Sequence, residues 1–179
     1  MSVSADTKIR VLFDAEMIAA RNHALAKEVK AAAPENLLVV AVLKGSFIFA
    51  ADLIRALTAH GLNPDVDFMT LASYGTGTTS SGTVSLLRDV EVDVARREVL
   101  LIDDILDSGR TLAFARAHMQ ARGARAVRTC VLLDKTKGRP GAIPPDFSGF
   151  DCPPAFVVGY GMDHAHKYRG LPFVAILKA

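Results

Sequence analysis

Two short runs of uninterrupted apolar residues constrain the fold more than any other feature of this sequence. They are LLVVAVL at 37–43 and VLLI at 99–102. Strands buried on both faces have continuous apolar sequences, whereas a strand with one solvent-exposed face alternates apolar and polar residues. Doubly buried strands occur in parallel sheets that helices cover on both sides. Further strands are predicted at 66–74, 84–87, 126–133, 156–160 and 173–177.

Helical segments alternate with these strands. The first helix is predicted after Asp14, a good N-cap residue, and before Pro34. Its apolar face is predicted to comprise Met17, Ile18, Leu25 and Val29. Two more helices are predicted at 47–60 and 111–122, each with a glycine directly after it. The alternation predicts an α/β fold with a doubly wound, mostly parallel sheet and helices on both faces.

Length and composition favour a single domain over residues 1–179, because half of the residues are hydrophobic and a chain of this size buries a sizeable core. Five of the eight prolines lie between 140 and 154, so an irregular excursion is expected there.

The charge balance argues against two classes of partner. A net charge of +2 is too small to indicate binding to nucleic acid or to a membrane. No run approaches the ~18 to 20 apolar residues of a membrane span, and the first ten residues lack the apolar core of a signal peptide. We therefore expect a cytoplasmic protein. Cys130 and Cys152 lack the spacing of a metal site and are predicted to be free thiols.

The second apolar run continues into an unusual acidic string, VLLIDDILDSGRTL at 99–112. Asp103, Asp104 and Asp107 follow the predicted strand, at the sheet edge where open α/β folds bind ligands. The string could be a solvated loop with a helix cap. It also suits a ribose phosphate that carries a diphosphate, because carboxylates hold sugar hydroxyls and hydrated magnesium while helix-start amides hold a phosphate.

A segment rich in glycine, serine and threonine covers residues 74–82. GTGTTS lacks the third glycine of a dinucleotide-binding fingerprint, and GTTSSG lacks the lysine of a P-loop. Two interpretations stay open at this point: a flexible surface loop, or the lid of an active site.

Four stretches together resemble the hypoxanthine-guanine branch of the type I phosphoribosyltransferases. LLIDDILDSGRT resembles the motif that binds phosphoribosyl diphosphate (PRPP) in all type I enzymes. The other three, in the expected order, are VLKGSF at 42–47, SYGTGTTSSG at 73–82, and LLDKTKGR at 132–139 with FVVGYGMD at 156–163. The resemblance extends from Val42 to Arg169 and implies a small hood, made of residues 1–14 and 150–179, over the sheet edge.

The resemblance implies roles for the acidic string. Asp103 and Asp104 would hold the two ribose hydroxyls, directly or through Mg2+. The residues that would surround the 5′-phosphate are Asp107, Ser108, Gly109, Arg110 and Thr111. Asp107 would also act as the general base that takes the proton from the imidazole ring of the purine. The family usually has Glu where Asp103 stands, so the reach of this side chain to a ribose hydroxyl is shorter.

For the diphosphate, the resemblance implies a site made by Lys44, Gly45, Ser73, Tyr74 and Arg169. The peptide bond between Leu43 and Lys44 is expected to be cis, as it often is in this family. Asp163 would hold a second magnesium ion, so that the metal-binding residues would be Asp103, Asp104 and Asp163.

For the base, the resemblance implies a pocket made by Lys135, Phe156, Val157 and Asp163. Lys135 would donate to the 6-oxo group, Phe156 would stack on the ring, and backbone groups of Val157 and Asp163 would bind its edge. His164 and His166 are two residues apart with no third ligand, so they are expected to be exposed polar residues.

The implied activity is a Mg2+-dependent transfer of ribose 5-phosphate from PRPP to a 6-oxopurine, with the segment at 73–82 excluding water as a lid. The sequence does not choose among hypoxanthine, guanine and xanthine. Two alternatives remain: an RNA-binding regulator that retains a PRPP motif, and a transferase for another nucleobase. The family suggests a homodimer or a homotetramer.

Overall fold

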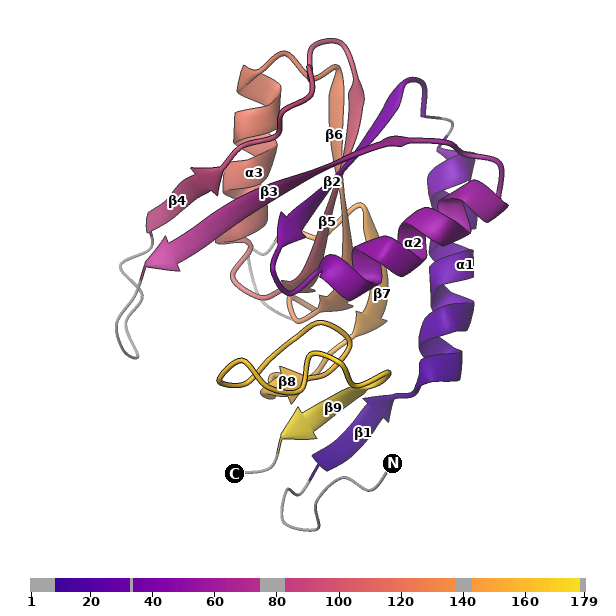
Figure 1. The fold of residues 1–179 in the computed structure, drawn as a ribbon, viewed down its shortest axis with the longest axis vertical. Helices are drawn as coiled ribbons and strands as arrows, with labels where there is room; N and C mark the ends of the chain where they lie inside the picture. The colour runs from indigo at the N-terminus through magenta and orange to yellow at the C-terminus, as the bar shows by residue number, and fades with distance from the viewer. Residues whose placement is uncertain (1–8, 33, 75–82, 138–142, 178–179) are drawn as a thin grey trace.

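The computed structural model describes residues 9–32, 34–74, 83–137 and 143–177. In chain order its elements are β1 (Ile9–Phe13), α1 (Ala15–Ala31), β2 (Leu37–Leu43), α2 (Phe47–Ala59), β3 (Asp65–Tyr74), β4 (Thr83–Arg88), β5 (Glu98–Leu106), α3 (Arg110–Ala121), β6 (Ala126–Asp134), β7 (Phe147–Asp151), β8 (Val157–Val158) and β9 (Val174–Leu177). Figure 1 shows their arrangement. None of the helices in the described ranges is long and apolar enough to cross a membrane.

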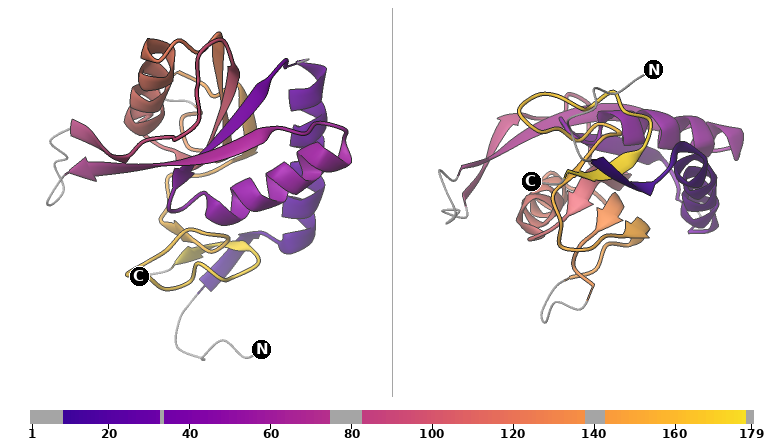
Figure 2. Two further views of the ribbon diagram at one scale, coloured as in Figure 1. Left: turned by 45° about the horizontal axis from the view of Figure 1, so that its top comes forward. Right: turned by 90° about the horizontal axis from the view of Figure 1, so that it is seen from below.

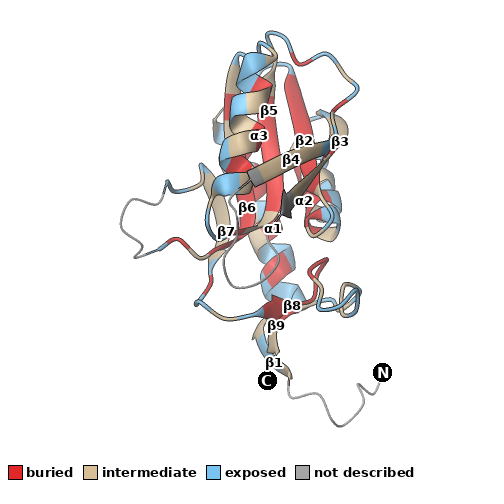
Figure 3. Ribbon diagram, turned by 90° about the vertical axis from the view of Figure 1, so that its left-hand side faces the viewer, coloured by how far each residue is buried: buried red, intermediate tan, exposed pale blue. Residues whose placement is uncertain are grey.

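The main sheet has six strands in the order β4-β3-β2-β5-β6-β7. All neighbouring pairs are parallel except β3 and β4, which pair antiparallel. β2 and β5, which contain the two uninterrupted apolar runs, lie side by side at the centre, and both runs are buried (Figure 3). The doubly wound, mostly parallel sheet predicted from the sequence is confirmed.

Helices cover both faces of this sheet (Figure 2). Alternate residues of the central strands divide between two cores, as the period of a strand requires. Val39, Ala41 and Leu100 pack with α1 and α2 on one face. Leu38 and Leu101 pack with α3 on the other face. Because each central strand faces helices on both sides, it needs apolar residues at every position.

The first helix begins as predicted but has a different buried face. Asp14 caps it, and its carboxylate accepts a hydrogen bond from the Met17 backbone at 2.8 Å. Met17 itself is 46% exposed, so the prediction that it joins the apolar face is wrong. That face instead consists of Ile18, Asn22, Leu25, Ala26 and Val29.

Two further predictions need correction. The central strand does not stop at Ile102 but continues through both acids to Leu106, because Asp103 still pairs with Val131 of β6. The proline-rich segment predicted to be irregular contains a strand at its end, β7, which adds to the edge of the sheet beside β6.

A second, small sheet lies beyond the carboxyl ends of β2, β5 and β6 (Figure 1). Its order is β1-β9-β8, with both pairings antiparallel, so it joins residues from the two ends of the chain. These strands come from the segments for which the hood was predicted. The small sheet therefore faces the carboxyl edge of the main sheet.

Candidate active site

A cavity of about 590 Å³ opens at this carboxyl edge. It brings together nine of the predicted site residues: Lys44, Gly45, Asp104, Asp107, Lys135, Phe156, Val157, Asp163 and Arg169. They are spread over 126 positions of the chain, from 44 to 169. The end of β2, the end of β5, the end of β6 and the small-sheet segment each contribute to the lining, as expected for a ligand site of an open α/β sheet.

The end of the cavity predicted to bind the diphosphate is formed by the turn that follows β2. The Leu43–Lys44 peptide bond is cis, as predicted. Ser46 is fully buried, and its hydroxyl donates to the Val42 carbonyl at 2.6 Å, which fixes the turn between strand and helix. Gly45 faces Asp104 so closely that a Cβ atom on it would lie 2.1 Å from Asp104 Oδ2. Only a residue without a side chain fits there while the carboxylate keeps this position.

The other residues predicted for the diphosphate end lie at a strand terminus. Ser73 and Tyr74 are the last two residues of β3, and their backbones pair with Val84 and Thr83 of β4. The rest of the predicted lid, 75–82, lies outside the described residues.

The two adjacent aspartates of β5 have different surroundings. Asp104 lines the cavity, whereas Asp103 is only 7% exposed and does not line it. Asp103 Oδ1 accepts a hydrogen bond from the Asp104 backbone at 3.0 Å. Burial and the charge of Asp104 raise the pKa of Asp103 well above its usual range, since both disfavour a second carboxylate charge. The predicted pair is therefore one accessible acid with a buried acid behind it.

The predicted phosphate-binding residues form the start of α3. Gly109 is its N-cap with φ of 78°, a left-handed conformation that glycine adopts without strain. Ser108 Oγ accepts from the Arg110 backbone at 3.5 Å. Asp107 lines the main cavity, while Ser108, Gly109 and Arg110 line an adjoining hollow of about 380 Å³, and Thr111 lines neither. A helix start of this kind presents free N–H groups and a partial positive charge to an anion.

The end of the cavity predicted to bind the purine is formed by the loop after β6 and by β8. Asp134 accepts hydrogen bonds from the Thr136 backbone and hydroxyl at 2.7 and 2.6 Å, and these bonds fix the turn that carries Lys135. Lys135 Nζ donates to the Ala155 carbonyl at 2.7 Å, next to Phe156. Phe156 is 55% exposed, so a large part of its ring is available for contact with a planar base.

Asp163 and Arg169 form an ion pair on the small-sheet side of the cavity. Arg169 Nη2 lies 2.6 Å from Asp163 Oδ1, and its Nη1 donates to the Gly161 carbonyl at 2.6 Å. Asp163 Oδ2 accepts from the backbone of His166 at 2.8 Å. His164 and His166 are exposed, as predicted.

The carboxylates of the cavity fit a hard divalent cation. Asp104 and Asp163 both line it and supply oxygen ligands, which such cations prefer. Within the described part of the chain, no three His, Cys, Asp or Glu side chains gather into a ready-made metal cage. This donor set suits an ion that keeps several waters and is shared with substrate phosphates.

Sequence reasoning missed part of the cavity wall. The additional lining residues are Leu43, Thr70, Leu71, Leu87, Ile105 and Met162. Thr70 and Leu71 lie next to each other where the pairing of β3 with β4 is irregular, and Leu87 projects from β4 nearby. Leu43, Ile105 and Met162 lie inside the quoted motifs, but the resemblance implies no binding role for them there. No motif marks Thr70, Leu71 and Leu87, because strand residues that line a ligand site look the same in sequence as core residues.

The chain belongs to the phosphoribosyl transferase family: the model of the phosphoribosyl transferase domain matches residues 12–165. Within this family its similar relatives are hypoxanthine-guanine phosphoribosyltransferases. The enzyme of Streptococcus thermophilus is 41% identical over 94% of this chain and 93% of its own length. That of Bacillus subtilis is 44% identical over 79% and 77% of the two chains.

Solved structures agree with this placement. The hypoxanthine phosphoribosyltransferase of Staphylococcus aureus superposes with a TM-score of 0.87 at 34% identity and covers 97% of this chain and 92% of its own. The Trypanosoma cruzi enzyme, solved in complex with its product IMP, gives 0.87 at 33% identity and covers 99% and 98%. The predicted type I phosphoribosyltransferase fold is confirmed.

Proposed function

We propose that this chain transfers ribose 5-phosphate from PRPP to hypoxanthine or guanine in purine salvage, giving the nucleoside monophosphate and diphosphate. One observation carries the proposal: a single cavity joins the acids of the PRPP motif to a lysine and an exposed aromatic ring. The names of the relatives support the same activity. They also weigh against the two alternatives, an RNA-binding regulator and a transferase for another nucleobase.

In the proposed reaction, the purine end orients the base. The Phe156 ring stacks on the purine, and Lys135 donates a charge-assisted hydrogen bond to the 6-oxo group. Backbone groups of Val157 and Asp163 bind the edge of the ring. Asp107, which lines the same cavity, accepts the imidazole proton as the new glycosidic bond forms.

At the other end, Asp104 binds the ribose hydroxyls, with Asp103 supporting it from behind, and the α3 start from Ser108 to Thr111 holds the 5′-phosphate. The Lys44–Gly45 turn, the end of β3 and Arg169 bind the diphosphate. Asp104 and Asp163 would each hold a Mg2+ ion, which would supply positive charge to the leaving diphosphate. Because the transition state resembles an oxocarbenium ion, water must be excluded, a role that we assign to residues 73–82 as a lid.

A product assay with PRPP, Mg2+ and each of adenine, hypoxanthine, guanine and xanthine tests this proposal. Nucleotide from hypoxanthine and guanine is expected, and the xanthine arm decides whether the third 6-oxopurine is also a substrate. Product from adenine alone, or from no purine, would overturn the assignment. Removing Mg2+ with a chelator should abolish the activity. We also propose a cytoplasmic location and a homodimeric or homotetrameric state. Analytical ultracentrifugation measures the oligomeric state.

A further inference from the structure

A sharp turn at 159–161 carries the residues of the small-sheet side of the cavity. All three of its residues have positive φ angles: 97° at Gly159, 49° at Tyr160 and 103° at Gly161. Glycine adopts this conformation freely, but it is strained for tyrosine. Strain of this kind persists where other interactions of the same residue offset it. The side chain of Tyr160 is therefore expected to form interactions that offset this strain and that a glycine at this position could not form.

The Tyr160 hydroxyl is buried and connects the turn to both helices on one face of the main sheet. It donates to Asp52 Oδ2 of α2 at 2.7 Å and accepts from Asn22 Nδ2 of α1 at 2.9 Å. Tyr160 and Asn22 are only 5% and 4% exposed. Burial and the neighbouring Asp52 raise the pKa of Tyr160, so the phenol keeps its proton and remains a donor.

The same turn holds the charged groups of the cavity wall. The Gly161 N–H donates to the Arg169 carbonyl at 2.9 Å, and its carbonyl accepts from the Arg169 guanidinium at 2.6 Å. That guanidinium pairs with Asp163. The turn also touches the diphosphate end, since a Cβ atom on Gly161 would lie 2.2 Å from the Gly45 carbonyl oxygen. A displacement of the turn would thus move Asp163 and Arg169 together relative to Gly45.

We propose that Tyr160 is a positioning residue for Asp163 and Arg169 on the small-sheet side of the cavity, acting through its hydroxyl on Asp52. The inference rests on the proposed function. α2 begins at Phe47, directly after the Lys44–Gly45 turn, so the bond to Asp52 fixes the small-sheet turn to the helix that follows the diphosphate loop. A packing role would need only the ring, whereas a positioning role needs the hydroxyl and an acceptor on α2.

The test compares variants that keep or remove this one bond. Tyr160→Phe keeps the ring but removes both hydrogen bonds of the hydroxyl, to Asp52 and from Asn22, and should raise the KM values for hypoxanthine and PRPP about fivefold or more while kcat changes less. Asp52→Ala should reproduce this effect. Asp52→Asn keeps an acceptor oxygen and should stay close to the wild type. Asp146→Ala is the control, because it loses bonds from Arg116 and Thr129 and none to the turn; its KM values should not change.

Thermal unfolding of every variant shows whether a raised KM reflects lost positioning or a general loss of stability. A wild-type KM in Tyr160→Phe and Asp52→Ala would overturn the proposal. So would a KM that rises in all variants, the Asp146→Ala control included, in proportion to their loss of stability. If the wild-type protein formed no nucleotide from hypoxanthine or guanine, the proposed function itself would fail, and that result is distinct from either outcome for Tyr160.

Discussion

Gly45 and Asp104 occupy adjoining space: the carboxylate of Asp104 fills the position that a side chain at residue 45 would need, with Oδ2 only 2.1 Å from a Cβ atom built there. The two residues belong to different strand ends, β2 and β5, which neighbour each other in the sheet. The contact therefore couples the proposed diphosphate loop to the proposed ribose site.

Gly45→Ala should weaken PRPP binding at least tenfold, because the added methyl group expels the Asp104 carboxylate from its place. The free energy of unfolding should change by less than about 1 kcal/mol, since the carboxylate lies at the cavity and can turn away. Equilibrium binding of PRPP with Mg2+, and urea unfolding, measure the two quantities. In an Asp104→Ala background, Gly45→Ala should reduce PRPP affinity much less than in the wild type. If the two substitutions reduced PRPP affinity additively, the two residues would not be coupled.

Asp104→Asn should weaken PRPP binding and reduce its dependence on Mg2+, because an amide is a poorer ligand for a hard cation than a carboxylate. Binding titrations at several Mg2+ concentrations measure this. The fold should persist, since Asp104 is only partly buried. A Mg2+ response identical to that of the wild type would refute the role of Asp104 as a metal-binding residue.

Lys135→Ala should reduce kcat/KM for the purine by about 30-fold to 1000-fold, or roughly 2 to 4 kcal/mol, because a charge-assisted hydrogen bond to the 6-oxo group is lost. PRPP affinity should change little. Lys137→Ala is a matched control two residues away, because Lys137 is exposed and pairs with Asp151 instead of lining the cavity. Equal losses in purine efficiency and PRPP affinity would show that Lys135 does not bind the base.

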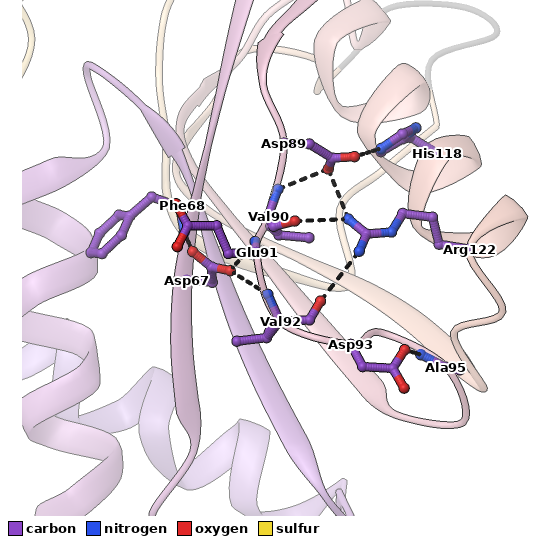
Figure 4. A network of polar contacts seen from close by, with 10 residues as sticks. All are labelled: Asp67, Phe68, Asp89, Val90, Glu91, Val92, Asp93, Ala95, His118 and Arg122. Carbon is purple, nitrogen blue, oxygen red and sulfur yellow. Dashed lines mark hydrogen bonds and ion pairs between the residues drawn. The ribbon is translucent and has the colours of Figure 1, made fainter.

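Asp89→Asn should destabilise the protein at neutral pH but not at low pH. Asp89 joins the segment between β4 and β5 to α3 through His118 at 2.8 Å and Arg122 at 3.0 Å (Figure 4). Burial alone would raise the pKa of Asp89, but the hydrogen bonds and charges of its partners outweigh burial and lower it. Because the pKa of Asp89 is lower in the folded state, its carboxylate stabilises the protein at pH values above the pKa that Asp89 has in the unfolded state. This contribution is lost as the pH falls through the pKa of the folded state.

Urea unfolding at pH 6 and pH 3 measures this difference. Because the carboxylate is partly exposed, the cost of Asp89→Asn at pH 6 should be only about 0.5 kcal/mol, and it should shrink toward zero at pH 3. Glu91→Gln, in the same segment but more exposed, should cost little at either pH. A penalty for Asp89→Asn that is the same at both pH values would show that its charge does not contribute.

The sequence predicts the central elements well because each of them depends on local pattern. The doubly buried strands, the Asp14 cap and the glycines after α2 and α3 follow from residue types at fixed spacing. The motifs likewise place nine residues in one cavity, because strands that end at the same edge bring their termini together. That agreement required no knowledge of side-chain packing.

The errors arise where packing between distant segments decides the outcome. β7 is hard to recognise because Gly149 interrupts it, yet the Leu132 carbonyl of β6 comes so close that a Cβ atom there would lie 2.4 Å from its oxygen. Asn22 lies on the buried face of α1, in part because Tyr160, 138 positions later, provides a partner. The burial of Asp103 depends on the continued pairing of β5 with β6, which the apolar run alone does not indicate.

The order of strands in the small sheet ties the beginning of the chain to the cavity. β1 contains no predicted site residue, but it pairs with β9, and β9 pairs with β8, where Val157 lies. Deleting residues 9–13 would leave β9 as an unprotected edge and loosen the backbone of Val157, which we propose faces the base. These five residues would thus act as a remote support for the proposed base recognition.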